Sequence, residues 1–219
     1  MTSAKNLALL AEQALERLGT QNMLWFQGDV FTNQFLYEQS RRLQRGFDAQ
    51  GLGAGDNICH CMSNHPLVYA VFGAIFRSGA TAVPVIHQLT PAELRYIFSH
   101  TETRCIVTDE SLVEKVRESI DGLDHVETLI VLGGRTNSSA RPAEFRLEEL
   151  LQADEMETIA DTDPEHVAVM LYTSGTTGRP KGDMLTHANF MASAEAGLQA
   201  SEFHSRTPPL PIRIATPTR

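Results

Sequence analysis

A short glycine-rich stretch, LYTSGTTGRPKG from Leu171 to Gly182, constrains the fold of this chain more than any other segment. The apolar run Val167–Leu171 precedes it, and a helical pattern begins soon after Thr186. Glycine permits backbone conformations that other residues rarely adopt, so a run with three glycines favours a compact turn. The stretch is therefore predicted to be a structured connection between two elements of secondary structure and not a flexible linker.

The residue types in this stretch are those that bind phosphate. Successive backbone N–H groups in glycine-rich turns form a concave surface that attracts anions, and Lys181 adds a mobile positive charge. A solvated surface loop rich in glycine, serine and threonine is the alternative. The Walker A pattern is excluded, because Lys181 does not follow a glycine. The glycines and hydroxyl residues concerned are Gly175, Gly178, Gly182, Thr173, Ser174, Thr176 and Thr177.

The rest of the chain alternates short β-branched strands with helical patterns, which is typical of parallel α/β units. Thr90 and Glu93 form the sequence pattern of a helix capping box, with Pro91 at the first helical position. The turn Gly28-Asp29 is predicted to join two strands of a hairpin. Expected helices span 7–18, 33–50, 66–78, 91–100, 111–120 and 147–151, and expected strands span 23–27, 30–31, 57–62, 80–86, 104–108, 126–132 and 167–171.

Composition excludes several classes of protein. The chain has 219 residues, enough for one sizeable domain, and a formal net charge of −9 without a visible basic stripe, which argues against a nucleic-acid partner. No run approaches the ~18 apolar residues of a membrane helix, and residues 1–19 lack the pattern of a signal peptide. The chain is therefore expected to be cytoplasmic, without a transmembrane segment.

Three cysteines, Cys59, Cys61 and Cys105, give no disulfide framework. On a strand, Cys59 and Cys61 would share one face, which could suggest metal ligands, but no second ligand pair stands at zinc spacing. Buried free thiols in a reducing compartment are the favoured interpretation, and no metal ligand is assigned. Most of the scattered histidines, His60, His65, His87 and His100, are interpreted as satisfied structural residues.

The glycine-rich stretch resembles the phosphate-loop signature of the adenylate-forming superfamily, [YF]TSGTTGxPKG followed by LTHxN. Tyr172–Gly182 matches throughout, and Leu185–His187 with Asn189 continues the match. This superfamily holds acyl-CoA synthetases, peptide-synthetase adenylation domains and luciferases. Looser matches, in the same order, cover residues 30–200 and resemble free-standing fatty acid–CoA ligases. The resemblance implies that residues 1–200 are the N-terminal part of such an enzyme, with a layered, mixed α/β fold.

The resemblance also implies a function, an ATP-dependent acid–CoA ligase that forms an acyl-adenylate and then a thioester. ATP, Mg²⁺ and coenzyme A would take part, together with a hydrophobic carboxylic acid. His187 is the histidine best placed to lie near the site, but it receives no chemical role, and no catalytic residue is assigned. By match, the nucleotide phosphates would be bound by Thr173, Ser174, Gly175, Thr176, Thr177, Gly178 and Lys181.

The sequence departs from the family pattern in three ways. The YGxTE, TGD and PKTxSGK-like stretches are absent. Asp183 stands where the family has a small apolar residue, so its carboxylate would be costly if buried, or would weaken phosphate binding if solvated. Residues 201–219 hold four prolines within ten residues, Pro208 to Pro217, which argues against a strand and predicts a divergent, disordered tail.

Two functions of different class remain open. The first is the ligase, represented by its phosphate-loop portion. The second is a truncated, non-catalytic product that binds nucleotide or a protein partner. The second predicts exposed apolar surface and self-association through it.

Overall fold

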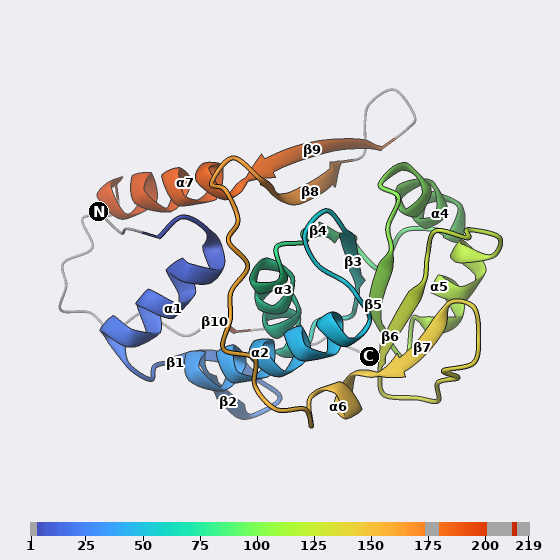
Figure 1. Cartoon of the computed structure of the whole chain (residues 1–219), viewed down its shortest axis with the longest axis horizontal. Coiled ribbons are helices and arrows are strands. Elements are labelled where there is room, and N and C mark those ends of the chain that lie inside the picture. Colours follow the sequence, from blue (N-terminus) through green and yellow to red (C-terminus); the bar gives the residue numbers. More distant parts are fainter. Residues whose placement is uncertain (1–3, 174–179, 201–211, 214–219) are drawn as a thin grey trace.

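The computed structural model describes residues 4–173, 180–200 and 212–213. Within these ranges the largest feature is a seven-stranded sheet in the order β7-β6-β5-β3-β4-β8-β9 (Figure 1). Neighbouring strands are parallel except β8 and β9, which are antiparallel. The predicted mixed α/β fold is therefore confirmed. The strands are β3 (Asn57–Cys61), β4 (Thr81–Pro84), β5 (Cys105–Asp109), β6 (Thr128–Leu132), β7 (Ala143–Arg146), β8 (Val167–Thr173) and β9 (Lys181–Thr186).

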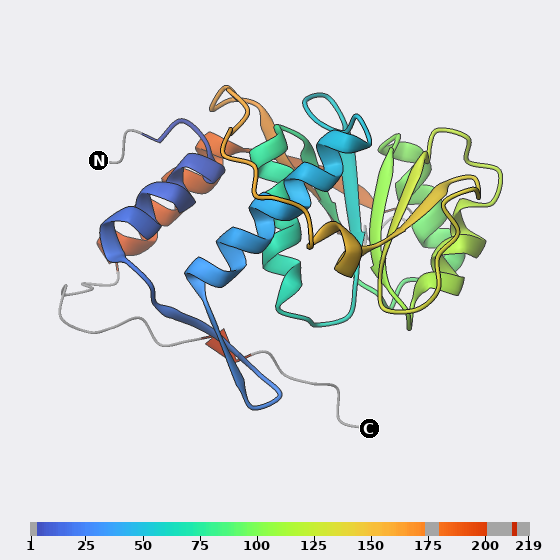
Figure 2. The same ribbon diagram turned by 60° about the horizontal axis from the view of Figure 1, so that its bottom comes forward.

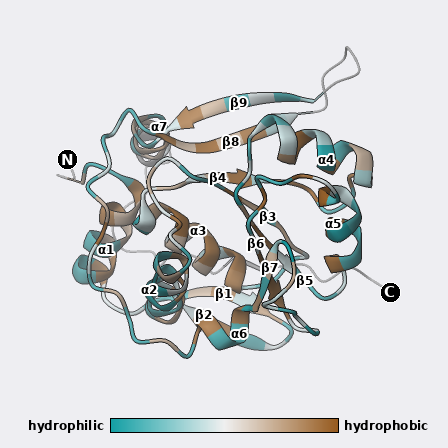
Figure 3. Cartoon of the chain, turned by 45° about the vertical axis from the view of Figure 1, so that its right-hand side comes forward, coloured by the Kyte–Doolittle hydropathy of each residue, from teal (hydrophilic) through white to brown (hydrophobic). Residues whose placement is uncertain are grey.

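Helices cover both faces of this sheet, so the central strands are buried on both sides. Ile58 and Val107 point to a core shared with α2 and α3, whereas Cys59 and Ile106 point to a second core shared with α4 and α5. Strands buried on both faces become nearly continuous apolar runs, and Figure 3 shows hydrophobic residues gathered on α3 and the central strands. These helices are α2 (Asn33–Ala49), α3 (Leu67–Ser78), α4 (Pro91–His100) and α5 (Val113–Ile120).

The helix boundaries follow the local patterns of the sequence. The Thr90 hydroxyl accepts from the Glu93 N–H, and the Glu93 carboxylate accepts from the Thr90 N–H, which confirms the capping box. Gly19 and Gly79, with φ of 66° and 76°, follow α1 (Leu7–Leu18) and α3 as predicted. The short α6 (Leu147–Leu150) is also confirmed. None of the helices in the described ranges is long and apolar enough to cross a membrane.

A smaller sheet projects away from the main body (Figure 2). It contains the hairpin of β1 (Asn22–Phe26) and β2 (Asp29–Thr32), and β10 (Ile212–Arg213) pairs parallel to β1. Phe26 pairs with Asp29, so the turn is Gln27-Gly28 and lies one residue before the predicted Gly28-Asp29. Both turn residues have positive φ, 52° and 97°, as a two-residue hairpin turn of matching twist requires. β10 was not expected, because the tail was predicted to contain no strand.

The strand β7 was also missed, because no element was expected between the strand at 126–132 and the helix at 147–151. β7 is short, lies at the sheet edge beside β6, and lacks β-branched residues. Its buried Glu144 is compensated by the Arg117 guanidinium, with an Nη2–Oε2 distance of 2.7 Å. A buried glutamate is not expected in a strand. Glu144 can be placed in one only when its partner Arg117 on α5 is known.

Candidate functional site

The predicted phosphate-binding stretch connects the two antiparallel strands β8 and β9. Thr173 and Lys181 are paired across these strands, so the two ends of the stretch lie next to each other at one end of the hairpin (Figure 1). The side chains of both residues are exposed. The other predicted phosphate-binding residues, Ser174, Gly175, Thr176, Thr177 and Gly178, lie outside the described residues.

The ring of Tyr172 fixes the hairpin next to this connection. A Cβ added to Gly182, its partner on β9, would lie 2.9 Å from the Tyr172 Cζ atom. The Tyr172 hydroxyl lies 2.6 Å from Nδ1 of His100, whose ring stacks on Tyr96 at a centroid distance of 5.5 Å. Burial raises the pKa of Tyr172. The absence of a side chain at Gly182 therefore leaves room for the Tyr172 ring. Its place in the sequence had suggested instead that a ligand approaches the backbone there.

Asp183 is exposed on β9, opposite Leu171 of β8. Of the two alternatives for this carboxylate, the structure supports the solvated one, so no burial cost arises. The carboxylate still stands two residues from Lys181. A negative charge at this position opposes the binding of a phosphate group at the adjacent connection.

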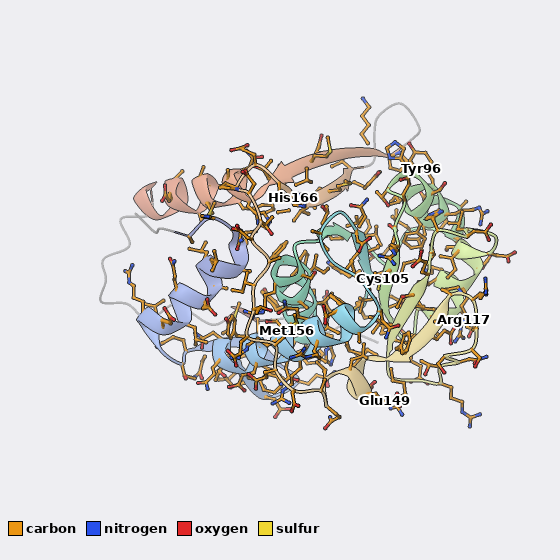
Figure 4. All side chains as sticks on the ribbon, viewed as in Figure 1. Tyr96, Cys105, Arg117, Glu149, Met156 and His166 are labelled. Carbon is orange, nitrogen blue, oxygen red and sulfur yellow. The ribbon has the colours of Figure 1, made fainter. Side chains whose placement is uncertain are left out.

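His187 does not lie near the connection, contrary to its predicted place. It begins α7 (His187–Ala200) at the other end of β9, and six residues of strand span about 20 Å. Figure 4 shows the two ends, with Tyr96 beside the connection and His166 near the start of α7. The buried His187 accepts a hydrogen bond at Nδ1 from the Leu7 N–H, 3.3 Å away. Its role is to hold α1 against α7.

Burial lowers the pKa of His187 to about 4, and the neighbouring His166 lowers it further to a lesser extent. The two rings stack at a centroid distance of 6.4 Å, and Phe76 contacts His187 edge-on at 5.7 Å. A neutral His187 is the form that accepts from Leu7, so its proton resides on Nε2. This environment suits a structural residue and not a proton-transfer group at pH 7.

A cleft of about 500 Å³ opens at the carboxyl ends of β3, β4 and β8. Thr173 and Pro180, which flank the undescribed residues, both line it. Sheets of this type bind ligands at the carboxyl ends of strands, where successive connections leave toward opposite faces. Here the connection after β3 leads to α3 on one face, and the connection after β4 leads to α4 on the other. The connection is the candidate phosphate site, and the cleft opens directly beside it.

His60 lines this cleft and is an exception among histidines of which most were expected to be satisfied structural residues. The residue is 9% exposed, yet neither ring nitrogen has a hydrogen-bond partner among the described residues. Burial lowers its pKa to about 4. The only sign of this exception in the sequence was the position of His60 between two cysteines, in a stretch that was predicted to be a strand.

A larger hollow of about 750 Å³ lies at the amino ends of β6 and β7 and is lined in part by Arg117. The Arg117 guanidinium is already bound by Glu144 and Glu114. This hollow is at the opposite end of the parallel strands from the connection. It is not the candidate site.

The three cysteines are buried, as predicted, and Cys59 and Cys61 share the face toward α4 and α5. Burial raises the pKa of all three thiols, to about 11 for Cys61. In the described part of the chain, no group of three histidine, cysteine or acidic residues could hold a metal ion.

Together, the layered sheet, the glycine-rich β8–β9 connection and the adjacent cleft define an α/β protein with a candidate ligand site at the carboxyl ends of its strands. The sequence model described as "AMP-binding enzyme" matches residues 10–209. The chain therefore belongs to the AMP-binding enzyme family, whose relatives include adenylate-forming acid–CoA ligases.

Two curated relatives illustrate the similarity. 4-Coumarate–CoA ligase 3 of Oryza sativa subsp. japonica is 33% identical over 166 residues, which cover 76% of this chain and 29% of the relative. Sulfoacetate–CoA ligase of Cupriavidus necator is 30% identical over 185 residues, which cover 83% of this chain and 34% of the relative.

The structure of a benzoate CoA ligase from Burkholderia xenovorans LB400 aligns with a TM-score of 0.73 and 25% identity, over 87% of this chain and 36% of that protein. The fold is that of the N-terminal portion of adenylate-forming enzymes. The chain spans about a third of the length of the relatives that it matches.

Proposed function

We propose that this chain provides the nucleotide-phosphate-binding part of an ATP-dependent acid–CoA ligase. In the first step of that reaction a carboxylate attacks the α-phosphorus of ATP, which gives an acyl-adenylate and releases pyrophosphate. In the second step the thiol of coenzyme A displaces AMP and forms a thioester. The observation that carries the proposal is the pairing of Thr173 with Lys181 beside the cleft, in a chain of the AMP-binding enzyme family.

The residues of the connection suit phosphate chemically. Hydroxyl groups and backbone N–H groups donate to phosphate oxygens, and the Lys181 ammonium supplies a positive charge that can follow them. The proposed set remains Thr173, Ser174, Gly175, Thr176, Thr177, Gly178 and Lys181. Their work is to bind and orient the β- and γ-phosphates and to stabilise the charge of the departing pyrophosphate.

Mg²⁺ would enter with the nucleotide. This ion keeps several waters and is held largely through substrate phosphates, and when bound it would neutralise phosphate charge. We assign no residue of this chain to adenine, acid or coenzyme A.

The acid substrate is proposed only as a class. The relatives are named for 4-coumarate, sulfoacetate and medium- or long-chain fatty acids, which share a carboxylate and differ in the rest of the molecule. A hydrophobic carboxylic acid remains our proposal, and fatty-acid metabolism is one of its forms. The three buried free thiols suit a reducing compartment, and we propose the cytoplasm.

Titration of the chain with Mg-ATP tests the nucleotide site. We expect Lys181→Ala to weaken ATP binding about 10- to 100-fold, because a hydrogen bond to a charged group contributes about 1.5–3 kcal/mol. Lys5→Ala is the matched control, since Lys5 is also exposed and its Nζ pairs with Asp161 at 3.6 Å, far along the sequence from the connection. Equal weakening in the two variants, or none in Lys181→Ala, would contradict the proposed site.

The second candidate function is non-catalytic binding of nucleotide or of a protein partner. It is favoured by exposed large apolar side chains, including Ile86 and Met184, which are 65% and 66% exposed. Assay of acid-dependent ATP–pyrophosphate exchange separates the two. Exchange with any acid in a panel of aromatic and aliphatic carboxylates supports the ligase. ATP binding without exchange, accompanied by dimers in sedimentation, supports the binding function and self-association.

A further inference from the structure

The ring of His60, which lines the cleft, has no hydrogen-bond partner among the described residues. It is the fourth residue of β3, where it pairs with Pro84 of β4 and Val107 of β5. The ring contacts Phe72 of α3 edge-on at a centroid distance of 4.5 Å. Neither Nδ1 nor Nε2 reaches a partner in the part of the chain that the structure describes. Buried polar groups in proteins are nearly always hydrogen-bonded, so an exception requires an explanation.

The walls of the cleft are mostly apolar, and the described residues that line it include no lysine or arginine. Its one acidic lining residue, Glu93, is already engaged, because its carboxylate accepts from the Thr90 N–H at 2.8 Å and the Thr90 hydroxyl at 2.7 Å. An anionic ligand group would lose its hydration in this cleft without meeting a cation among the described residues that line it. The lining therefore favours an uncharged ligand.

The protonation state of His60 points in the same direction. Burial holds its pKa near 4, so the imidazole is neutral at pH 7. A neutral imidazole presents one N–H donor and one bare nitrogen that accepts. Amide and hydroxyl groups complement this pair, since each can donate and accept.

We propose that the cleft is a binding subsite for an uncharged organic ligand, which hydrogen-bonds to His60 through an amide or hydroxyl group. The apolar remainder of the ligand would lie against Met62, Val68 and Ile97, which also line the cleft. The proposal stands apart from the nucleotide site, although Thr173 and Pro180 bring the two next to each other. It does not depend on Lys181 or on bound ATP.

Benzamide and benzoate form a matched pair of probes, because they share a ring and differ in charge. The 219-residue chain, labelled with ¹⁵N at histidine, is titrated with each in the absence of nucleotide. We expect benzamide to shift the ring nitrogens of His60 and to leave those of His187 unchanged, with benzoate at least tenfold weaker. No shift at His60 up to the solubility of benzamide would overturn the proposal. Benzoate binding as tight as benzamide would overturn its uncharged-ligand part.

His60→Phe removes both ring nitrogens and keeps an aromatic ring beside Phe72. We expect benzamide affinity to fall at least fivefold, whereas ATP affinity stays unchanged. His87→Phe is the control, because His87 lines the same cleft but is partly exposed. Equal benzamide affinity in wild type and His60→Phe would contradict the role of His60. If His60→Phe does not fold, the wild-type titration decides. If the chain binds benzamide at His60 but does not bind ATP, the proposed function is overturned and the proposed His60 subsite is not.

Discussion

His60 and His187 are both buried in neutral form, but the surroundings of the two rings give them different roles. Burial is the main cause of the low pKa in both cases, and both values lie near 4. His187 accepts from the Leu7 N–H and lies between Phe76 and His166, so it joins α1 to α7. His60 has no such partner among the described residues and lines a cleft. Burial and pKa alone therefore do not separate a structural histidine from one that faces a ligand.

The pH dependence of stability is the largest effect that follows from this pair. Both histidines have folded-state pKa values of about 4, below the ordinary value of 6.5. The unfolded chain therefore binds more protons between these values, and stability is complete above about pH 6.5 and falls as the pH drops toward 4. Between pH 7 and pH 4.5 each histidine is expected to account for about 2–3 kcal/mol of this loss. Urea denaturation at pH 7 and pH 4.5 measures it.

His60→Phe is expected to remove roughly half of the histidine-dependent loss, because Phe does not titrate. An unchanged difference in stability between the two pH values in this variant would contradict the assignment to His60. Acidic residues also titrate in this range. The test is therefore the difference between variant and wild type in how the free energy of unfolding changes with pH, and not the size of that change in either protein alone.

His187→Ala is expected to destabilise the chain by about 2–4 kcal/mol, through loss of a buried ring and of the acceptor for the Leu7 N–H. Urea denaturation at pH 7 measures the change. His87→Ala, a partly exposed control, should cost less than about 1 kcal/mol. His60→Phe at the same pH should be nearly neutral, since an apolar ring replaces an unsatisfied polar one. Equal losses in His187→Ala and His60→Phe would remove the distinction between the two histidines.

Gly182→Ala is expected to destabilise the β8–β9 hairpin by about 1–3 kcal/mol. The new Cβ would lie 2.9 Å from the Tyr172 ring, and that ring is also held by His100. Tyr172→Phe is the control, which keeps the ring and loses only the hydrogen bond, at about 1 kcal/mol. Thermal denaturation compares them. A Gly182→Ala variant as stable as wild type would show that the Tyr172 ring is free to move.

Asp183→Val gives the smallest effect. Because Asp183 is exposed, its repulsion of a bound phosphate is screened by solvent and salt. We expect ATP affinity to rise about two- to fivefold at low salt and hardly at all at high salt. Glu38→Val provides a charge-matched control away from the connection. Glu38 lies on α2, and its carboxylate accepts a hydrogen bond from the Gln34 side chain. Unchanged ATP affinity in Asp183→Val at low salt would contradict the hypothesis that the Asp183 carboxylate weakens phosphate binding.

The features that the sequence predicted correctly depend on residues close together in the chain. The Thr90–Glu93 capping box and the helix ends at Gly19 and Gly79 follow from local hydrogen bonding and backbone freedom. The shared face of Cys59 and Cys61 follows from the two-residue period of a strand. These interactions need no knowledge of the rest of the fold.

The features that it missed depend on distant partners. β7 needs Arg117 to compensate Glu144, and the role of Gly182 needs the Tyr172 ring. His187 was placed near the site because it follows the glycine-rich stretch closely in sequence, but a strand carries it away. In the candidate site, Thr173 and Lys181 come together through the antiparallel register of β8 and β9. Their pairing could not be predicted without the strand that Lys181 begins.

The most direct test of the account is the mapping of Mg-ATP binding on the ¹⁵N-labelled chain by backbone amide shifts. We predict saturable shifts at Thr173 and Lys181, the two paired ends of the connection, with His187 and Arg117 unchanged. Saturable shifts confined to the hollow around Arg117, or no saturable shift at Thr173 and Lys181, would contradict the assignment of the β8–β9 connection as the nucleotide site.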